Sequence, residues 1–140
     1  MEGTLEFSLY TDGASRGNPG PAAIGYVLYD NAGNIVESKA RTVGRRTNNE
    51  AEYEALVWGL QKAHERGVRK IRVCSDSELV VKQINGEYRI TEERLRRYAN
   101  RVLVTAKLFE SFVLSHVSRE NPRTRMVDEM VNAALDQAGF

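Results

Sequence analysis

The chain has 140 residues and a mass of 15.8 kDa, the size of one domain, so we expect a single domain over residues 1–140. Its composition, 41% hydrophobic and 28% charged with a net charge of +1, argues against a disordered or membrane-bound protein. The single cysteine, Cys74, and the lack of a basic start followed by an apolar stretch indicate a cytoplasmic protein, expected to be monomeric, with Cys74 in its core.

Hydrophobic periodicity predicts the elements along the chain. Alternation predicts strands over residues 4–11, 22–29 and 35–42, with a loop over 13–21 that holds three glycines and two prolines. Steps of three and four predict a helix from Asn48 to Arg66. There follow a strand over 70–75, a helix over 76–85, a helix over 91–109, a strand over 112–117 and a helix over about 125–137. This order predicts an α/β fold with a five-stranded mixed sheet, three antiparallel strands and then parallel ones, flanked by helices.

Charge is unevenly spread over the chain. Residues 82–107 carry 7 basic and 3 acidic side chains, a local charge of +4. Such a stretch favours a face that binds a polyanion, although a solvated helix face explains the charge equally well.

Four carboxylates stand at positions where surface acids are not expected. Asp12 and Asp76 end the first and fourth predicted strands, and ligand crevices form at the carboxyl ends of such strands. Glu52 and Asp128 lie on the apolar faces of their helices, so all four could meet, although a place near a helix N-terminus also explains Glu52 and Asp128. Converging carboxylates need cations or arginines, and an oxygen-only donor set suits Mg²⁺ or Mn²⁺ better than zinc.

Several other chemistries do not fit the residues. The loop over 17–21 has no following Lys-Ser or Lys-Thr, so it is no Walker A loop. Ser15 and Ser77 lie outside a G-x-S-x-G elbow, and His64 lies among polar helix residues and is expected to face solvent.

Four blocks of sequence, taken together, resemble the type 1 ribonuclease H family over nearly the whole chain. They are YTDGASRGNPGP over residues 10–21, TNNEAE over 47–52, SDS over 75–77, and Asp128 followed by NAA over 132–134. The resemblance implies a ribonuclease H-like fold and an endonuclease that hydrolyses the RNA strand of an RNA/DNA hybrid with two divalent metal ions, Mg²⁺ or Mn²⁺. It implies that Asp12 binds both metals, Asp128 the one that activates water, and Glu52 and Asp76 the one beside the leaving oxygen.

The resemblance also implies substrate contacts. Asn48 and Asn49 match a pair that reads base edges in the minor groove, where the 2′-OH distinguishes RNA from DNA. Asn18, Arg45 and Thr47 match a pocket for a DNA phosphate.

Glu78 and Lys82, one helical turn apart, are expected to face the hybrid, and Glu78 replaces a glutamine common in the family. Many bacterial members carry a long basic insertion, the handle, before the following helix. Residues 86–91 are too short for it, so the chain resembles the handle-less branch, and the arginines of residues 89–101 are expected to contact phosphates instead.

A mobile auxiliary residue of the family matches either His116 or Arg119, because the segment over 122–127 looks like a lengthened loop. We favour Arg119, because it lies beyond the predicted strand, where a long cation could reach over the metals toward the scissile phosphate. Two other functions remain open at this point. One is a nuclease of the same fold that acts on double-stranded RNA or another structured nucleic acid. The other is a non-catalytic hybrid-binding module, which would have no need of four mutually repelling acids.

Overall fold

The structure, a computed structural model, describes residues 5–140. Its nine elements are, in order, β1 (Glu6–Ser15), β2 (Gly20–Tyr29), β3 (Ile35–Arg46), α1 (Asn48–Glu65), β4 (Lys70–Ser75), α2 (Glu78–Ile84), α3 (Glu93–Ala106), β5 (Ser111–His116) and α4 (Pro122–Gln137). The predicted strand start at Thr4 lies outside the described residues. Within residues 5–140, every helix is too short or too polar to cross a lipid bilayer.

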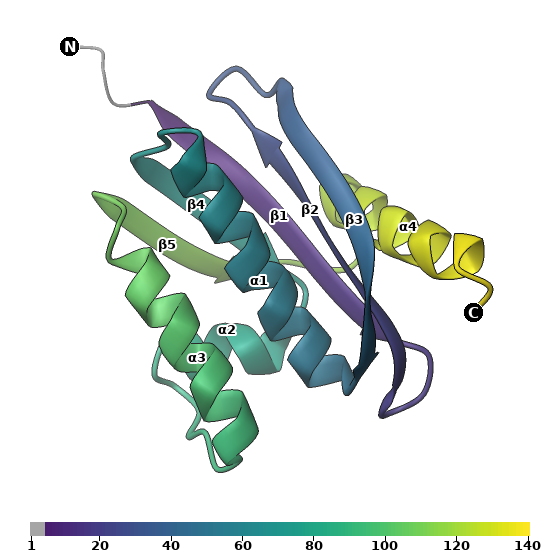
Figure 1. The fold of residues 1–140 in the computed structure, drawn as a ribbon. Helices are drawn as coiled ribbons and strands as arrows, with labels where there is room; N and C mark the ends of the chain where they lie inside the picture. Colours follow the sequence, from purple (N-terminus) through teal and green to yellow (C-terminus); the bar gives the residue numbers. More distant parts are fainter. Residues whose placement is uncertain (1–4) are drawn as a thin grey trace.

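One mixed sheet forms the centre of the molecule. Its strand order is β3-β2-β1-β4-β5, with antiparallel pairing among β1, β2 and β3 and parallel pairing of β4 with β1 and β5. Helices α1, α2 and α3 cover one face and α4 covers the other (Figure 1). The predicted fold class is confirmed, and Cys74 is buried as expected.

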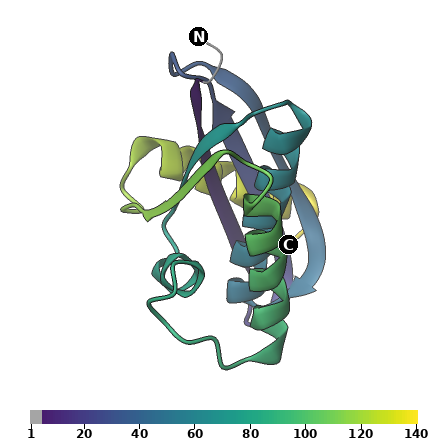
Figure 2. The ribbon, with the colours of Figure 1, turned by 90° about the vertical axis from the view of Figure 1, so that its left-hand side faces the viewer.

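The connection between α2 and α3 is short. It spans residues 85–92 and contains no further helix, as Figure 2 shows. Asn85 ends α2, and Gly86 follows with a φ of 82°, a conformation that glycine adopts at little cost. The chain therefore lacks room for a basic handle, as the sequence predicted.

The predicted loop over residues 13–21 is wrong at both ends. β1 continues to Ser15 and β2 begins at Gly20, because residues 13–15 pair with residues 22–24 of β2. Gly13 serves close packing here: a Cβ on it would lie 2.2 Å from the carbonyl oxygen of Ala51 in α1. A glycine is therefore required here because α1 crosses β1 at close range, whereas the sequence alone predicted a loop.

The last helix begins at Pro122, three residues before its predicted start. Asn121 caps it by accepting hydrogen bonds from the N–H groups of Arg123 and Thr124, and proline at the first helical position has no amide to leave unpaired. The segment over 122–127 is therefore helix, and the expectation of a lengthened loop there is wrong.

Two further boundaries differ from prediction. β3 runs to Arg46 instead of 42, since a bulge opposite Ala22 and Ala23, with Gly44 at a φ of 86°, lets pairing continue. α3 spans 93–106 instead of 91–109: Phe109 is buried in the core from a turn that follows the helix, which explains its fit to the helical period.

Candidate active site

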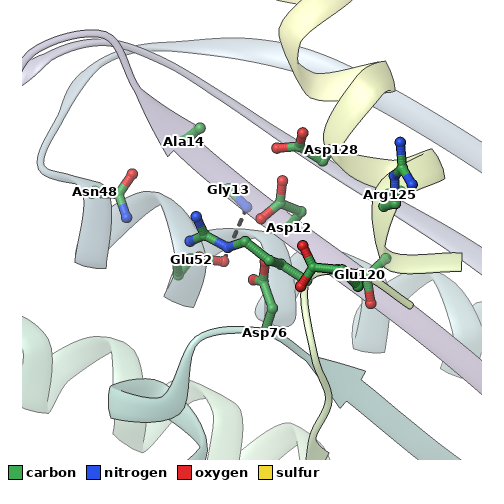
Figure 3. Close-up of a pocket in the computed structure, with 11 residues that line it drawn as sticks. Asp12, Gly13, Ala14, Asn48, Glu52, Asp76, Glu120, Arg125 and Asp128 are labelled. Atoms are coloured by element: carbon green, nitrogen blue, oxygen red, sulfur yellow. Dashed lines mark hydrogen bonds between the residues drawn. The ribbon is translucent and has the colours of Figure 1, made fainter. Parts of the chain in front are cut away.

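The four carboxylates meet at one pocket of about 430 Å³ (Figure 3). Asp12, Glu52 and Asp76 form its centre, and each offers an oxygen within 4.8 Å of the others. Asp128 lines the same pocket from α4 but lies outside this trio and is exposed to solvent. Its expected inward position is thus wrong: the buried face of α4 is Thr124, Val127, Val131 and Leu135.

Strand register brings Asp12 and Asp76 together. Tyr10 of β1 pairs in parallel with Cys74 of β4, and each aspartate lies two residues further along its strand direction. Asp12 lies three residues before the end of β1, so the expectation that it ends its strand is wrong. The crevice opens where β1 and β4 stop pairing, just beyond Tyr10 and Cys74.

Glu52 reaches the same place from α1. Because Gly13 has no side chain, the backbone of α1 packs directly on β1 beside it. The Gly13 N–H then donates a hydrogen bond to Oε1 of Glu52 at 3.1 Å. One glycine therefore allows the close approach and also orients the carboxylate.

The pocket disfavours the ionised form of its own carboxylates. Burial, followed by repulsion from Asp76 and Asp128, raises the pKa of Asp12 to about 8. Burial and repulsion from Asp12 raise the pKa of Glu52 well above its ordinary value, and burial raises that of Asp76. Arg119 lowers the pKa of both Glu52 and Asp76, which partly offsets these effects.

This environment fits a divalent cation. Oδ2 of Asp12 is buried and accepts no hydrogen bond from any described residue. An unsatisfied buried carboxylate oxygen is costly, and a cation would satisfy it and favour the ionised form of all the acids. The donors are all carboxylate oxygens, the ligands preferred by Mg²⁺ and Mn²⁺.

A polar network holds Asp128. Nδ2 of Asn132 donates to its Oδ1 at 3.3 Å, and Oδ1 of Asn132 accepts from Arg16 at 3.2 Å. Arg16 also pairs with Asp136 at 2.8 Å and donates to the carbonyl oxygen of Phe140 at 2.5 Å. The loop after β1 is thereby tied to α4.

The residues expected at a DNA phosphate lie around the start of α1. Oδ1 of Asn18 accepts from the Asn48 N–H at 2.9 Å, and Oδ1 of Asn48 accepts from the Ser15 N–H at 3.3 Å. The Thr47 hydroxyl caps α1 by accepting from the Glu50 N–H at 3.2 Å. Arg45 is exposed at the end of β3 beside them.

The Asn18 and Thr47 side chains therefore use acceptor oxygens within the protein. Among the described residues, the Asn18 amide N–H groups and the Thr47 hydroxyl hydrogen have no acceptor, so they can donate to a ligand. Donors beside an exposed arginine match the chemistry of a phosphate group.

The remaining predicted residues are less closely grouped. Asn49 is half-buried in the first turn of α1. Glu78 and Lys82 form an ion pair of 3.0 Å on α2. Arg119 lines the pocket, whereas His116 ends β5, is exposed, and is not among the lining residues.

Five lining residues were not predicted to belong to the site: Gly13, Ala14, Glu120, Thr124 and Arg125. Thr124 and Arg125 precede Asp128 by four and three residues, so a helix starting at Pro122 would have placed all three close together. The misplaced helix start concealed Thr124, whereas Arg125 already lay in the predicted helix. The hydroxyl oxygen of Thr124 is buried and has no hydrogen-bond partner among residues 5–140.

Several known proteins are similar to this chain in sequence. A family model described as reverse transcriptase-like matches residues 10–134. Ribonuclease HI of Halobacterium salinarum is 43% identical over 129 residues, 92% of this chain and 64% of that protein. A bifunctional protein of Mycobacterium tuberculosis is 37% identical over 136 residues, 96% of this chain and 36% of that protein. The chain thus spans less than two thirds of either relative.

Solved structures agree over nearly their full length. The crystal structure of RNase H1 from Halobacterium salinarum has a TM-score of 0.91 and 41% identity, with 94% of this chain and 98% of that chain covered. LC11-RNase H1 in complex with an RNA/DNA hybrid has a TM-score of 0.88 and 36% identity, with 96% and 99% covered. With this identity across whole domains, the chain belongs to the type 1 ribonuclease H family.

Proposed function

We propose that this chain is an endoribonuclease that hydrolyses the RNA strand of RNA/DNA hybrids. The observation that carries the proposal is the carboxylate trio, in which Asp12 and Glu52 are buried and an Asp12 oxygen is unsatisfied. The structural relatives of the chain include an RNase H1 in complex with an RNA/DNA hybrid. A module that only bound hybrids would gain nothing from three acids whose pKa values are raised by burial and mutual repulsion.

Two divalent metal ions, Mg²⁺ or Mn²⁺, would be held by Asp12, Glu52, Asp76 and Asp128. When bound, they supply positive charge to the attacking and leaving oxygens of the phosphodiester. Asp12 is the most buried of the four and central, and we assign it to both ions.

The protein's own groups prepare this chemistry. The Gly13 N–H fixes the Glu52 carboxylate, and the Asn132 amide fixes that of Asp128. The positive charge of Arg119 stabilises the ionised forms of Glu52 and Asp76. Arg119 also lines the pocket in which the scissile phosphate would bring further negative charge. Preorganised charge of this kind lowers the cost of reorganisation during reaction.

Substrate choice would come from the start of α1. Asn48 lines the carboxylate pocket and Asn49 follows it, so the RNA strand at the pocket would place the minor groove over both amides. An amide can donate and accept, and therefore suits base edges and the 2′-OH. Asn18, Arg45 and Thr47 would hold a phosphate of the DNA strand.

The test is cleavage of matched 20-base-pair duplexes, with RNA/DNA hybrid, double-stranded RNA and double-stranded DNA, each with Mg²⁺ and with Mn²⁺. We expect cleavage only of the RNA strand in the hybrid, and none by Asp12→Asn. Preferred cleavage of double-stranded RNA would assign the site to the other nuclease class, and tight hybrid binding without cleavage would make the chain a binding module.

A further inference from the structure

Three arginines form a stripe along α3. Arg94, Arg97 and Arg101 follow one another at steps of three and four, so they share one side of the helix. Together with Tyr98 and Glu50 they line a pocket of about 310 Å³ between α3 and the start of α1. This pocket is separate from the carboxylate site.

Most of the stripe's charge is available to a ligand. Arg94 pairs with Glu50 at 3.5 Å, but its side chain is still 61% exposed. Within the described part of the chain, Arg97 and Arg101 form no ion pair. The guanidinium of Arg101 lies 5.8 Å from the centre of the Tyr98 ring, and this ring is fixed by stacking on Tyr53. The pocket is thus basic, and the stacked Tyr98 ring forms one of its walls.

The stripe is connected to the start of α1. Glu50 accepts from the Thr47 N–H at 2.8 Å through one oxygen and pairs with Arg94 through the other. Glu54, one turn further on α1, pairs with Arg46 at 2.9 Å and accepts from Tyr98 at 3.5 Å. The N-terminal ends of α1 and α3 lie at the same end of the helix layer (Figure 1).

Helix geometry places Asn49 between the acids and the stripe. At 100° per residue, Asn49 lies between the direction of Glu52, which faces the carboxylate pocket, and that of Glu50, which faces the stripe. A duplex that passes from the carboxylate pocket over Asn49 therefore extends toward α3.

We propose that Arg94, Arg97 and Arg101 form a second site for backbone phosphates of the bound duplex, outside the cleavage pocket. This inference rests on the proposed function. The stripe covers seven residue steps, about 10 Å along the helix, and a nucleic-acid strand carries a charge about every 3.4 Å of its axis. The three guanidinium groups along this length could therefore contact about three phosphates of one strand.

The test measures the affinity of the Arg97→Gln/Arg101→Gln variant for an RNA/DNA hybrid by fluorescence anisotropy at several salt concentrations. The buffer contains no divalent metal, so the hybrid stays uncleaved. We expect the slope of log affinity against log salt to fall by about 2, one unit for each lost phosphate contact. Single-turnover cleavage at saturating enzyme should stay within twofold. The Arg97→Lys/Arg101→Lys variant should keep the wild-type slope.

A matched control separates local contact from total charge. Lys70→Gln/Lys107→Gln removes the same total charge. Lys70 begins β4, and Lys107 caps the C-terminal end of α3, the opposite end of that helix from Arg94. This control should keep the slope. Equal slopes in both double variants overturn the inference, even if the wild type cleaves hybrids as proposed. Failure of the wild type to cleave hybrids, with the slope still reduced only in the arginine variant, would instead overturn the proposed function and leave the phosphate site standing.

Discussion

Asn132 donates a hydrogen bond to the Asp128 carboxylate across 3.3 Å, one turn further along α4. Asp128 is the most exposed of the four acids, so this amide and the Arg16 contact behind it are what limit its motion. Partners of this kind orient metal ligands, and their loss commonly weakens metal affinity by 10- to 100-fold.

Replacing Asn132 with Leu keeps the size of the side chain and removes the hydrogen bond. We expect Mn²⁺ affinity, measured by titration calorimetry without substrate, to fall by about 10-fold. Asn100→Leu, on the exposed face of α3, is the matched control and should leave affinity unchanged. Affinities within twofold of wild type for both variants would show that Asp128 needs no such support.

Asp12→Asn tests the centre of the site. The variant keeps the shape but removes one charge, so turnover should fall by about 1,000-fold, equal to about 4 kcal/mol of transition-state stabilisation. Hybrid cleavage in Mg²⁺ measures this, with Glu65→Gln, an exposed acid at the end of α1, as the control. Activity at a tenth of wild type would contradict the assignment.

The same variant should change the pH dependence of metal-free stability. The pKa of Asp12 is raised to about 8 in the folded state, so folding is favoured while the group is protonated in both states, below its ordinary value near 4. That advantage is lost as pH rises toward 8. Asp12→Asn should therefore flatten the decline of the thermal midpoint between pH 4 and 8, measured by circular dichroism in EDTA, and raise the midpoint at pH 8.

The parts of this site that could be predicted are those that have a local signal in the sequence. Asp12 and Asp76 stand out because strand ends and breaks in periodicity are local properties. That their side chains meet depends on the parallel pairing of Tyr10 with Cys74, which is a property of the assembled sheet.

The failures have physical causes as well. The sequence predicts a loop at Gly13, because the contact that requires a glycine is not visible locally. It comes from Ala51, 38 positions away in the sequence. Pro122 suggested a loop, although proline also opens helices, and Asn121 as the cap decides between the two. With that helix start misplaced, Thr124 could not be assigned to the pocket.

Arg45→Ala tests the proposed DNA phosphate pocket. Loss of one contact should reduce the salt slope of hybrid binding by about 1 and leave single-turnover cleavage at saturation unchanged. Lys39→Ala, on the same strand at an exposed position, is the control. If the slope is the same in Arg45→Ala and wild type, Arg45 is only a solvated strand residue.

Glu37→Gln tests acid stability away from the site. The hydroxyl of Tyr26 and the guanidinium of Arg66 lower the pKa of Glu37 to about 2, so the charged form stabilises the fold above about pH 4.5, and this contribution disappears as pH falls toward 2. The variant should lose about 1–2 kcal/mol at pH 7, since a hydrogen-bonded charge is replaced by a neutral amide. Its stability in urea should then vary less between pH 5 and 2 than that of Glu110→Gln, a more exposed ion-pair control.

Arg119 and His116 compete for the role of auxiliary residue, and the geometry favours Arg119. It lines the pocket, while His116 lies three residues earlier at the end of β5. An arginine stays charged near neutral pH, so it would stabilise phosphate charge and could not act as a base. Arg119→Ala should lower single-turnover cleavage about 10-fold or more, the effect of losing one electrostatic stabiliser, without weakening Mn²⁺ binding.

His116→Ala should have the smaller effect, because its ring lies outside the pocket lining. Steady-state rates must be measured beside single-turnover rates, since a residue that helps product leave affects only the former. If His116 were the proton carrier, the cleavage rate of the wild type would depend on pH in a way that His116→Ala removes. That result, together with a larger loss in His116→Ala than in Arg119→Ala, would place the auxiliary residue at the end of β5 instead of in the loop before α4.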